Sequence, residues 1–154
     1  DLWQKQGFLE TTEGNVIHYG YIEKFIENLG ERFNIREIAF DRWGAVQMVQ
    51  NLEGMGFTVV PFGQGFKDMS PPTKELMKLV LEKKIAHGGH PVLRWMMDNI
   101  FIRTDPAGNI KADKEKSTEK IDGAIATIMA LDRAIRMGND NAASVYDSRG
   151  ILFI

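Results

Sequence analysis

The stretch from residue 35 to residue 60, IREIAFDRWGAVQMVQNLEGMGFTVV, contains the pattern that decides the fold class. A short apolar run ends at Asp41, apolar residues at helical spacing follow, and a second apolar run is stopped by Pro61. A strand, a helix and a strand in this order form a parallel pair with a right-handed crossover. The sequence therefore predicts an α/β fold, with Asp41 at the sheet edge where α/β proteins bind ligands.

Four more helices are predicted around this unit from the spacing of apolar residues. They cover about 19–31, a segment that starts at Ser70-Pro71, 91–97, and 117–137. A serine followed by proline is a typical helix start, because serine caps the helix and proline fits its first turn. We expect three of the helices to bury one face each, formed by Ile22, Phe25, Ile26 and Leu29, by Leu76, Met77, Val80 and Leu81, and by Ile121, Ala124, Ile125, Ile128, Leu131 and Ile135.

The remaining segments are predicted as loops or a hairpin. Residues 1–14 are expected to be extended chain and turns, and residues 100–111 to form a β-hairpin around the turn Asp105–Asn109. His87 and His90 flank a Gly-Gly turn. Two histidines without further ligands are weak evidence for a metal, so a turn with polar flanks is the preferred interpretation.

Composition excludes several classes of protein. At 154 residues the chain is one domain or a large piece of one, and it contains no cysteine, which removes disulfides, zinc–thiolate sites and thiol catalysis. The formal net charge of −2 gives no global basic field, so any nucleic-acid site must be local. No apolar run approaches membrane-spanning length, and no signal-peptide pattern is present.

Asp41 and Asp122 are the candidate catalytic and metal-binding residues. Asp122 lies one residue after the apolar Ile121, near the start of the last predicted helix. One carboxylate at a strand end and one on a later helix can hold Mg²⁺ or Mn²⁺ against a phosphate. The alternatives are an N-cap for Asp41 and a surface aspartate near the positive end of the helix dipole for Asp122. Gly123 inside a helix suggests that another group approaches closely there.

Lysines gather just before and within the start of this helix. Lys114, Lys116 and Lys120 are candidates for contacts to DNA phosphates beside a metal site, and so is Arg42 next to Asp41. Acidic residues alternate with the lysines, so a solvated face of mixed charge is the alternative explanation for most of them.

Three motifs together resemble one known family. They are Phe40-Asp41-Arg42-Trp43, His87-Gly88-Gly89-His90-Pro91-Val92-Leu93-Arg94-Trp95-Met96, and Lys116-Ser117-Thr118-Glu119-Lys120-Ile121-Asp122-Gly123. In this order they resemble the C-terminal nuclease domain of the large terminase subunit of tailed phages. The resemblance runs from about Gly14 to Arg136.

The resemblance implies an RNase H-like fold, a mixed sheet flanked by helices, truncated at its N-terminus. It implies a two-metal endonuclease that uses Mg²⁺ or Mn²⁺ to cut concatemeric double-stranded DNA during packaging in the bacterial host cell. Of the family's three acidic metal ligands, the middle one falls on Asp41 and the last on Asp122. The first lies on an opening strand that precedes Asp1, so this chain is expected to be a weak or inactive nuclease. The portal and the small terminase subunit are the implied partners.

A second hypothesis is a non-catalytic docking module that binds the portal or another terminase subunit. It rests on the apolar end Ile151-Leu152-Phe153-Ile154, which could add as a strand to an exposed sheet edge. We expect residues 1–140 to form the nuclease domain and residues 141–154 to form a C-terminal tail.

Overall fold

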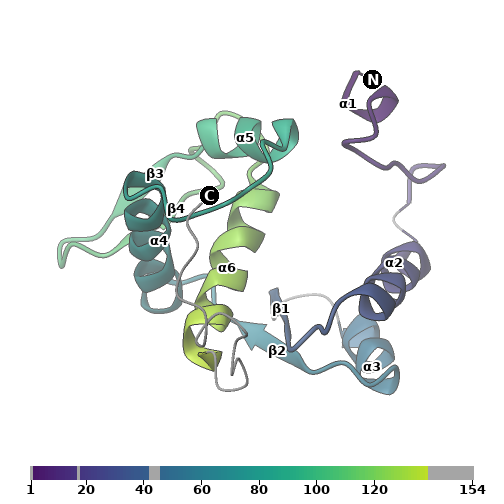
Figure 1. Cartoon of the computed structure of the whole chain (residues 1–154). Coiled ribbons are helices and arrows are strands. Elements are labelled where there is room, and N and C mark those ends of the chain that lie inside the picture. Colours follow the sequence, from purple (N-terminus) through teal and green to yellow (C-terminus); the bar gives the residue numbers. More distant parts are fainter. Residues whose placement is uncertain (1, 17, 42–45, 139–154) are drawn as a thin grey trace, which may run out of the picture.

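The computed structural model describes residues 2–16, 18–41 and 46–138 and has a mixed α/β architecture (Figure 1). Its strands form two short two-stranded sheets, with helices packed beside them. The elements in chain order are α1 (Leu2–Lys5), α2 (Tyr19–Arg32), β1 (Ile38–Asp41), α3 (Val46–Gly54), β2 (Val59–Phe62), α4 (Phe66–Leu81), α5 (Pro91–Asp98), β3 (Ile102–Thr104), β4 (Ile110–Ala112) and α6 (Asp122–Met137).

The predicted strand–helix–strand unit is confirmed. β1 and β2 pair in parallel, with Ile38 opposite Val59 and Asp41 opposite Phe62. The prediction that Pro61 stops the second strand is wrong, because Pro61 lies inside β2 and pairs with Phe40. A proline is tolerated in this position because, within the described residues, β2 pairs with β1 alone, so its outer side needs no hydrogen-bond donor.

The start of α4 differs from its prediction. The helix begins at Phe66, and Gly65 is its N-cap, so Ser70 lies inside the helix and does not cap it. The Ser70 hydroxyl instead accepts a hydrogen bond from the Ile110 backbone N–H at 3.1 Å and so connects α4 to β4. The predicted cap was wrong because this contact spans forty residues of sequence, which local pattern analysis does not see.

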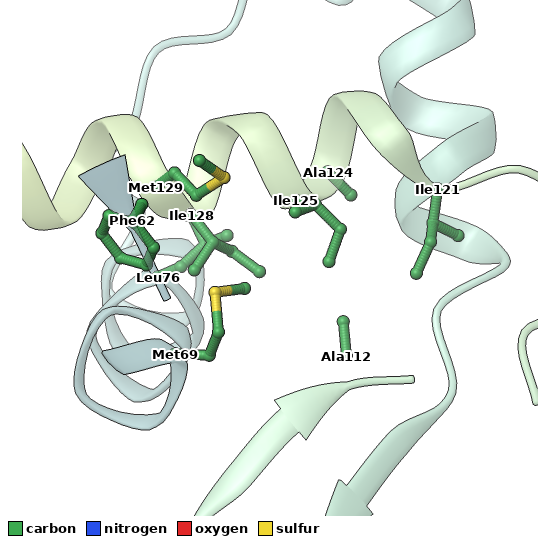
Figure 2. Close-up of a cluster of buried hydrophobic side chains, with 9 residues drawn as sticks. All are labelled: Phe62, Met69, Leu76, Ala112, Ile121, Ala124, Ile125, Ile128 and Met129. Carbon is green, nitrogen blue, oxygen red and sulfur yellow. The ribbon is translucent and has the colours of Figure 1, made fainter. Parts of the chain in front are cut away.

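The core lies between α6, α4 and the ends of β2 and β4 (Figure 2). α6 supplies four of its nine members and its N-cap Ile121 a fifth, and the apolar stripe predicted for this helix is buried from Ile121 to Ile128. Ile135, at the far end of the stripe, is exposed. The cluster consists of Phe62, Met69, Leu76, Ala112, Ile121, Ala124, Ile125, Ile128 and Met129.

Two other helices bury less than predicted. α2 matches its predicted range to within one residue, yet it has no buried residue, and Ile22 and Phe25 are exposed. Of the face predicted for α4, only Leu76 is buried. The other three side chains of that face, Met77, Val80 and Leu81, line an open apolar groove between α4, α5, β3 and α6.

At the N-terminus, residues 2–5 form the short helix α1 where extended chain was predicted. The helix packs through Trp3 against Trp95 of α5, with ring centroids 5.5 Å apart in an edge-to-face arrangement. Phe8 packs in the same way on His90, at 5.3 Å. These tertiary contacts fix a segment whose local sequence gives no helical pattern.

Candidate metal and nucleic-acid site

Asp122 is the first residue of α6, five residues later than the predicted helix start at Ser117. Its carboxylate accepts a hydrogen bond from Lys114 Nζ at 2.8 Å. This hydrogen bond, assisted by the positive charges of Lys114 and Lys120, holds the pKa of Asp122 below its usual range despite partial burial. Asp122 is therefore ionised at neutral pH and exposed at the N-terminal end of the helix.

The helix starts late because the residues before it make other contacts. The Ser117 hydroxyl donates to the Asp113 carbonyl at 2.6 Å and accepts from the Phe101 backbone N–H at 3.1 Å. Thr118 donates to the Asn99 side chain at 2.7 Å. These bonds attach the segment 113–118 to the end of α5 and the start of β3, so it forms a turn.

Asp41 is the last residue of β1 and is exposed, as the strand–helix–strand pattern predicts. Arg42 lies outside the described residues. At the other end of the strand, Glu37 accepts two hydrogen bonds from Arg133 of α6, at 2.6 and 3.2 Å. Phe62, the register partner of Asp41, belongs to the same core cluster as Met129 of α6. These contacts join β1 and its partner strand β2 to α6.

The structure brings some of the candidate lysines together and not others. Lys114 is paired with Asp122, and Lys120 is close enough to lower the pKa of Asp122. Lys116 lies over the Phe101 ring, 5.4 Å from its centroid, so its ammonium is held beside β3. Lys114 and Lys120 thus lie near Asp122, one of the two candidate metal ligands, whereas Lys116 contacts Phe101.

The two histidines have structural contacts. His90 is the N-cap of α5, and its Nδ1 accepts from the Leu93 backbone N–H at 3.4 Å. His87 Nδ1 accepts from the Gly89 N–H at 3.2 Å. The preferred interpretation of a turn with polar flanks is confirmed.

Gly123 has the close neighbour that the sequence suggested. Its backbone N–H donates to Met96 Sδ of α5 at 3.1 Å, and a Cβ built on Gly123 would lie 2.7 Å from that sulfur. The glycine thus lets α5 pack against the first turn of α6, beside Asp122.

Three features of charged residues were not predicted from the sequence. They are the buried carboxylate of Asp113, the buried carboxylate of Asp132, and the half-buried ion pair between Glu37 and Arg133, which are 96 residues apart. The pairing of Asp132 with Arg136 at i,i+4 could have been found from spacing. Nothing local marks the other two.

Asp41 and Asp122 are the kind of donor that a divalent metal needs. They offer the carboxylate oxygens that Mg²⁺ and Mn²⁺ prefer. Within residues 2–16, 18–41 and 46–138, no group of three or more His, Cys, Asp and Glu side chains is placed to hold a metal.

Comparisons with known proteins identify the family. The family model described as terminase large subunit, endonuclease domain, matches residues 1–138. The large terminase subunit of Enterobacteria phage HK97 is 38 % identical over 136 residues, which are 87 % of this chain and 27 % of that protein. Protein YmfN of Escherichia coli (strain K12) is 30 % identical over 152 residues, covering 97 % of this chain and 33 % of YmfN.

The crystal structure of the HK97 bacteriophage large terminase is similar to this chain, with a TM-score of 0.79 and 38 % identity over 86 % of this chain and 28 % of that one. This chain belongs to the endonuclease domain family of the terminase large subunit. It spans a third or less of the length of these relatives. Within the described residues, no helix is both long and apolar enough to cross a bilayer.

Proposed function

We propose that this chain is the nuclease part of a phage DNA-packaging terminase, with an RNase H-like fold, and that it contributes Asp41 and Asp122 to a divalent-metal site that cuts double-stranded DNA. The single observation that supports this most is the chain's membership of the terminase endonuclease family over residues 1–138. Concatemeric phage DNA is the proposed substrate, and the portal and small terminase subunit are the proposed partners of the longer protein. The nuclease domain is proposed to extend to residue 140.

The packing of β1 and β2 against α6 supports a joint role for the two aspartates. Asp41 ends β1 opposite Phe62, and Phe62 belongs to the same buried cluster as Ile121, the residue before Asp122. Glu37, just before β1, is hydrogen-bonded to Arg133 of α6. The two carboxylates are therefore carried by elements that pack into one core.

Each residue has a proposed task. Asp41 and Asp122 bind and orient metal, and the low pKa of Asp122 beside Lys114 keeps its carboxylate ionised as metal arrives. When bound, the metals supply a water nucleophile at neutral pH and stabilise the leaving oxygen of the phosphodiester. Lys114, Lys116 and Lys120 are proposed to contact phosphates, and Arg42 is proposed to do so beside Asp41.

Metal titration tests this proposal without requiring activity. We expect Mn²⁺ to bind wild-type protein in calorimetry, and Asp41→Asn and Asp122→Asn each to weaken it at least tenfold. Asp98→Asn, which changes an exposed carboxylate at the end of α5, is the matched control and should bind as wild type does. Equal Mn²⁺ affinity in all four proteins would refute the metal site.

We further expect the 154-residue chain to cleave DNA weakly or not at all. Within the described residues no group of three or more His, Cys, Asp and Glu side chains is placed to hold a metal, and Mg²⁺ needs enough carboxylates to complete an octahedral shell. Incubation with plasmid and Mn²⁺, followed by gel analysis, measures this. Efficient cleavage that disappears in Asp41→Asn would show that the two aspartates are sufficient.

A further inference from the structure

Asp113 is a buried carboxylate that the proposed metal site does not use. Only 6 % of the residue is exposed, in the turn between β4 and α6. Its Oδ1 accepts the backbone N–H groups of Glu115 at 3.0 Å and Lys116 at 3.2 Å. Within the described part of the chain, Oδ2 receives no hydrogen bond, and its nearest cation is Arg103 Nη1 at 3.7 Å. Burying a carboxylate costs free energy, so the folded turn carries the unfavourable free energy of burying Asp113.

The main chain of Asp113 fixes the same turn from its other side. Its N–H donates to the Phe101 carbonyl at 2.9 Å, and its own carbonyl accepts from the Ser117 N–H at 3.0 Å and from the Ser117 hydroxyl at 2.6 Å. Asp113 therefore determines the path of the chain at both ends of a five-residue turn.

Two of the candidate phosphate-binding lysines extend from this turn. Lys114 directly follows Asp113 and reaches Asp122 Oδ1 at 2.8 Å. Lys116, whose backbone N–H bonds to Asp113, lies over the Phe101 ring. A lysine ammonium has three hydrogens to donate, so Lys114 can keep its bond to Asp122 and also contact a phosphate.

We propose that Asp113 is a positioning residue: by holding the turn 113–117 it aims Lys114 and Lys116 at the phosphate backbone of DNA bound beside Asp122. This inference rests on the proposed function. Asp113 itself touches neither DNA nor metal in this arrangement. Its effect reaches DNA through the turn and the two lysines.

The salt dependence of DNA binding measures this role. Each phosphate contact to duplex DNA contributes about 0.9 to the slope of log affinity against log salt concentration. The full 154-residue chain is titrated with a fluorescent 25-base-pair duplex in Ca²⁺ buffer at several salt concentrations. Lys114→Met/Lys116→Met should lower the slope by up to about 2. Asp113→Ala should lower it in the same direction and weaken binding several-fold.

Two variants separate positioning from charge and from general loss of structure. Asp113→Asn retains a side-chain oxygen that can accept the two N–H groups, so it should restore the wild-type slope. Asp105→Ala is the matched control. It also removes one negative charge and one turn, since Asp105 Oδ1 accepts the Asn109 N–H at 2.8 Å, but that turn lies in the β3–β4 hairpin. We expect it to keep the wild-type slope.

Failure of the inference and failure of the proposed function give different results. A lower slope in the lysine variant with a wild-type slope in Asp113→Ala overturns the inference and leaves the proposed function standing. A wild-type slope in the lysine variant overturns the phosphate role on which both depend. If Asp113→Ala does not fold, Ser117→Ala loosens the same turn and leaves the carboxylate in place, and a wild-type slope in that variant also overturns the inference.

Discussion

The two ends of this molecule use helices of similar amphipathic character in different ways. α6 packs against α4, α5 and β1 and buries Ala124, Ile125 and Ile128. α2 lies on the far side of the β1–β2 sheet in Figure 1, contacts α3, and buries none of its residues. Its apolar side chains Tyr21, Ile22 and Phe25 are exposed.

This difference shows that an apolar stripe predicts a helix more securely than it predicts a buried face. The stripe sets the helix, because its spacing matches the helical period. Burial also needs a packing partner at the right distance. Within the described residues, α6 packs against α4, α5 and β1, whereas α2 packs mainly against α3. Within those residues, β1 pairs with β2 alone, so its other edge carries no second strand. The prediction that the tail Ile151-Leu152-Phe153-Ile154 fills this edge lies outside the described residues.

The largest expected difference in stability between the two regions comes from replacing one isoleucine by alanine in each helix. Ile128→Ala removes a side chain that is 1 % exposed, and the lost burial and new cavity should destabilise the fold by about 2–5 kcal/mol. Ile22→Ala removes a side chain that is 40 % exposed and should cost under about 1 kcal/mol. Urea unfolding followed by circular dichroism measures both. Similar losses would mean that α2 has a packing partner in solution.

Glycine-to-alanine substitutions in the two regions should change the free energy of unfolding by an intermediate amount. Gly123→Ala puts a Cβ 2.7 Å from Met96 Sδ, so the flexible Met96 side chain must move, at a cost of about 1 kcal/mol that alanine's better helix propensity offsets in part. Gly54→Ala, at the end of α3, meets nothing within 4 Å and should stabilise by up to about 1 kcal/mol.

Thermal melting distinguishes these two glycine variants by the sign of the shift in Tm. Met96→Ala added to Gly123→Ala removes the clashing sulfur. The double variant should therefore lose less stability than the sum of the two single changes. Simple additivity would show that the contact between α5 and α6 is not the cause.

The smallest expected effect concerns the pH dependence of stability. The Arg133 guanidinium holds the pKa of Glu37 below its ordinary value, chiefly by hydrogen bonding. A carboxyl whose pKa is lower in the folded state stabilises the fold above its unfolded pKa, and this stabilisation is lost as the pH falls through the folded pKa. Glu37→Gln should therefore be less stable than wild type at pH 7, and the gap should close below about pH 4.

The matched change in the other region is Glu27→Gln. Glu27 pairs with Lys24 on exposed α2 at 2.7 Å, and exposed pairs of this kind contribute little. We expect its stability curve to follow that of wild type from pH 3 to pH 8. Chemical unfolding at a series of pH values records both variants, and an equal response would indicate that the pair between β1 and α6 is no stronger than a surface pair.

The sequence predicted local elements well where the signal was local. The parallel pair of strands, the range of α2, the start of α5 at Pro91 and the end of α6 at Gly138 all follow from spacing and from proline and glycine positions. The two wrongly predicted helix starts have one physical cause, which is long-range hydrogen bonding. Ser70 accepts from Ile110 of β4, and Ser117 accepts from Phe101 just before β3, so neither residue starts its helix.

For the same reason, some residues of the candidate site were identified from the sequence and others were not. Asp41 and Asp122 stand out because each adjoins an apolar pattern, and Lys114 was identified by its place in a lysine cluster. The role of Asp113 was not visible, because its neighbours Glu115 and Lys116 give it the look of one more charge in a solvated run. Only burial and the bonds of Oδ1 distinguish it.

The buried stripe of α6 also fixes the rotational phase of Asp122. Each residue of an α-helix turns the chain by about 100°, at 3.6 residues per turn. With Ala124, Ile125 and Ile128 locked into the core, the direction in which Asp122 projects is set as firmly as the packing itself. One residue inserted between Asp122 and that stripe would swing the carboxylate, together with the buried Ile121 before it, by more than a quarter turn while Ala124, Ile125 and Ile128 stay in place. The packing of the core and the direction of the Asp122 carboxylate thus depend on the same rotation of α6 about its axis. A change in length within the first turn of the helix cannot preserve both the packing and that direction.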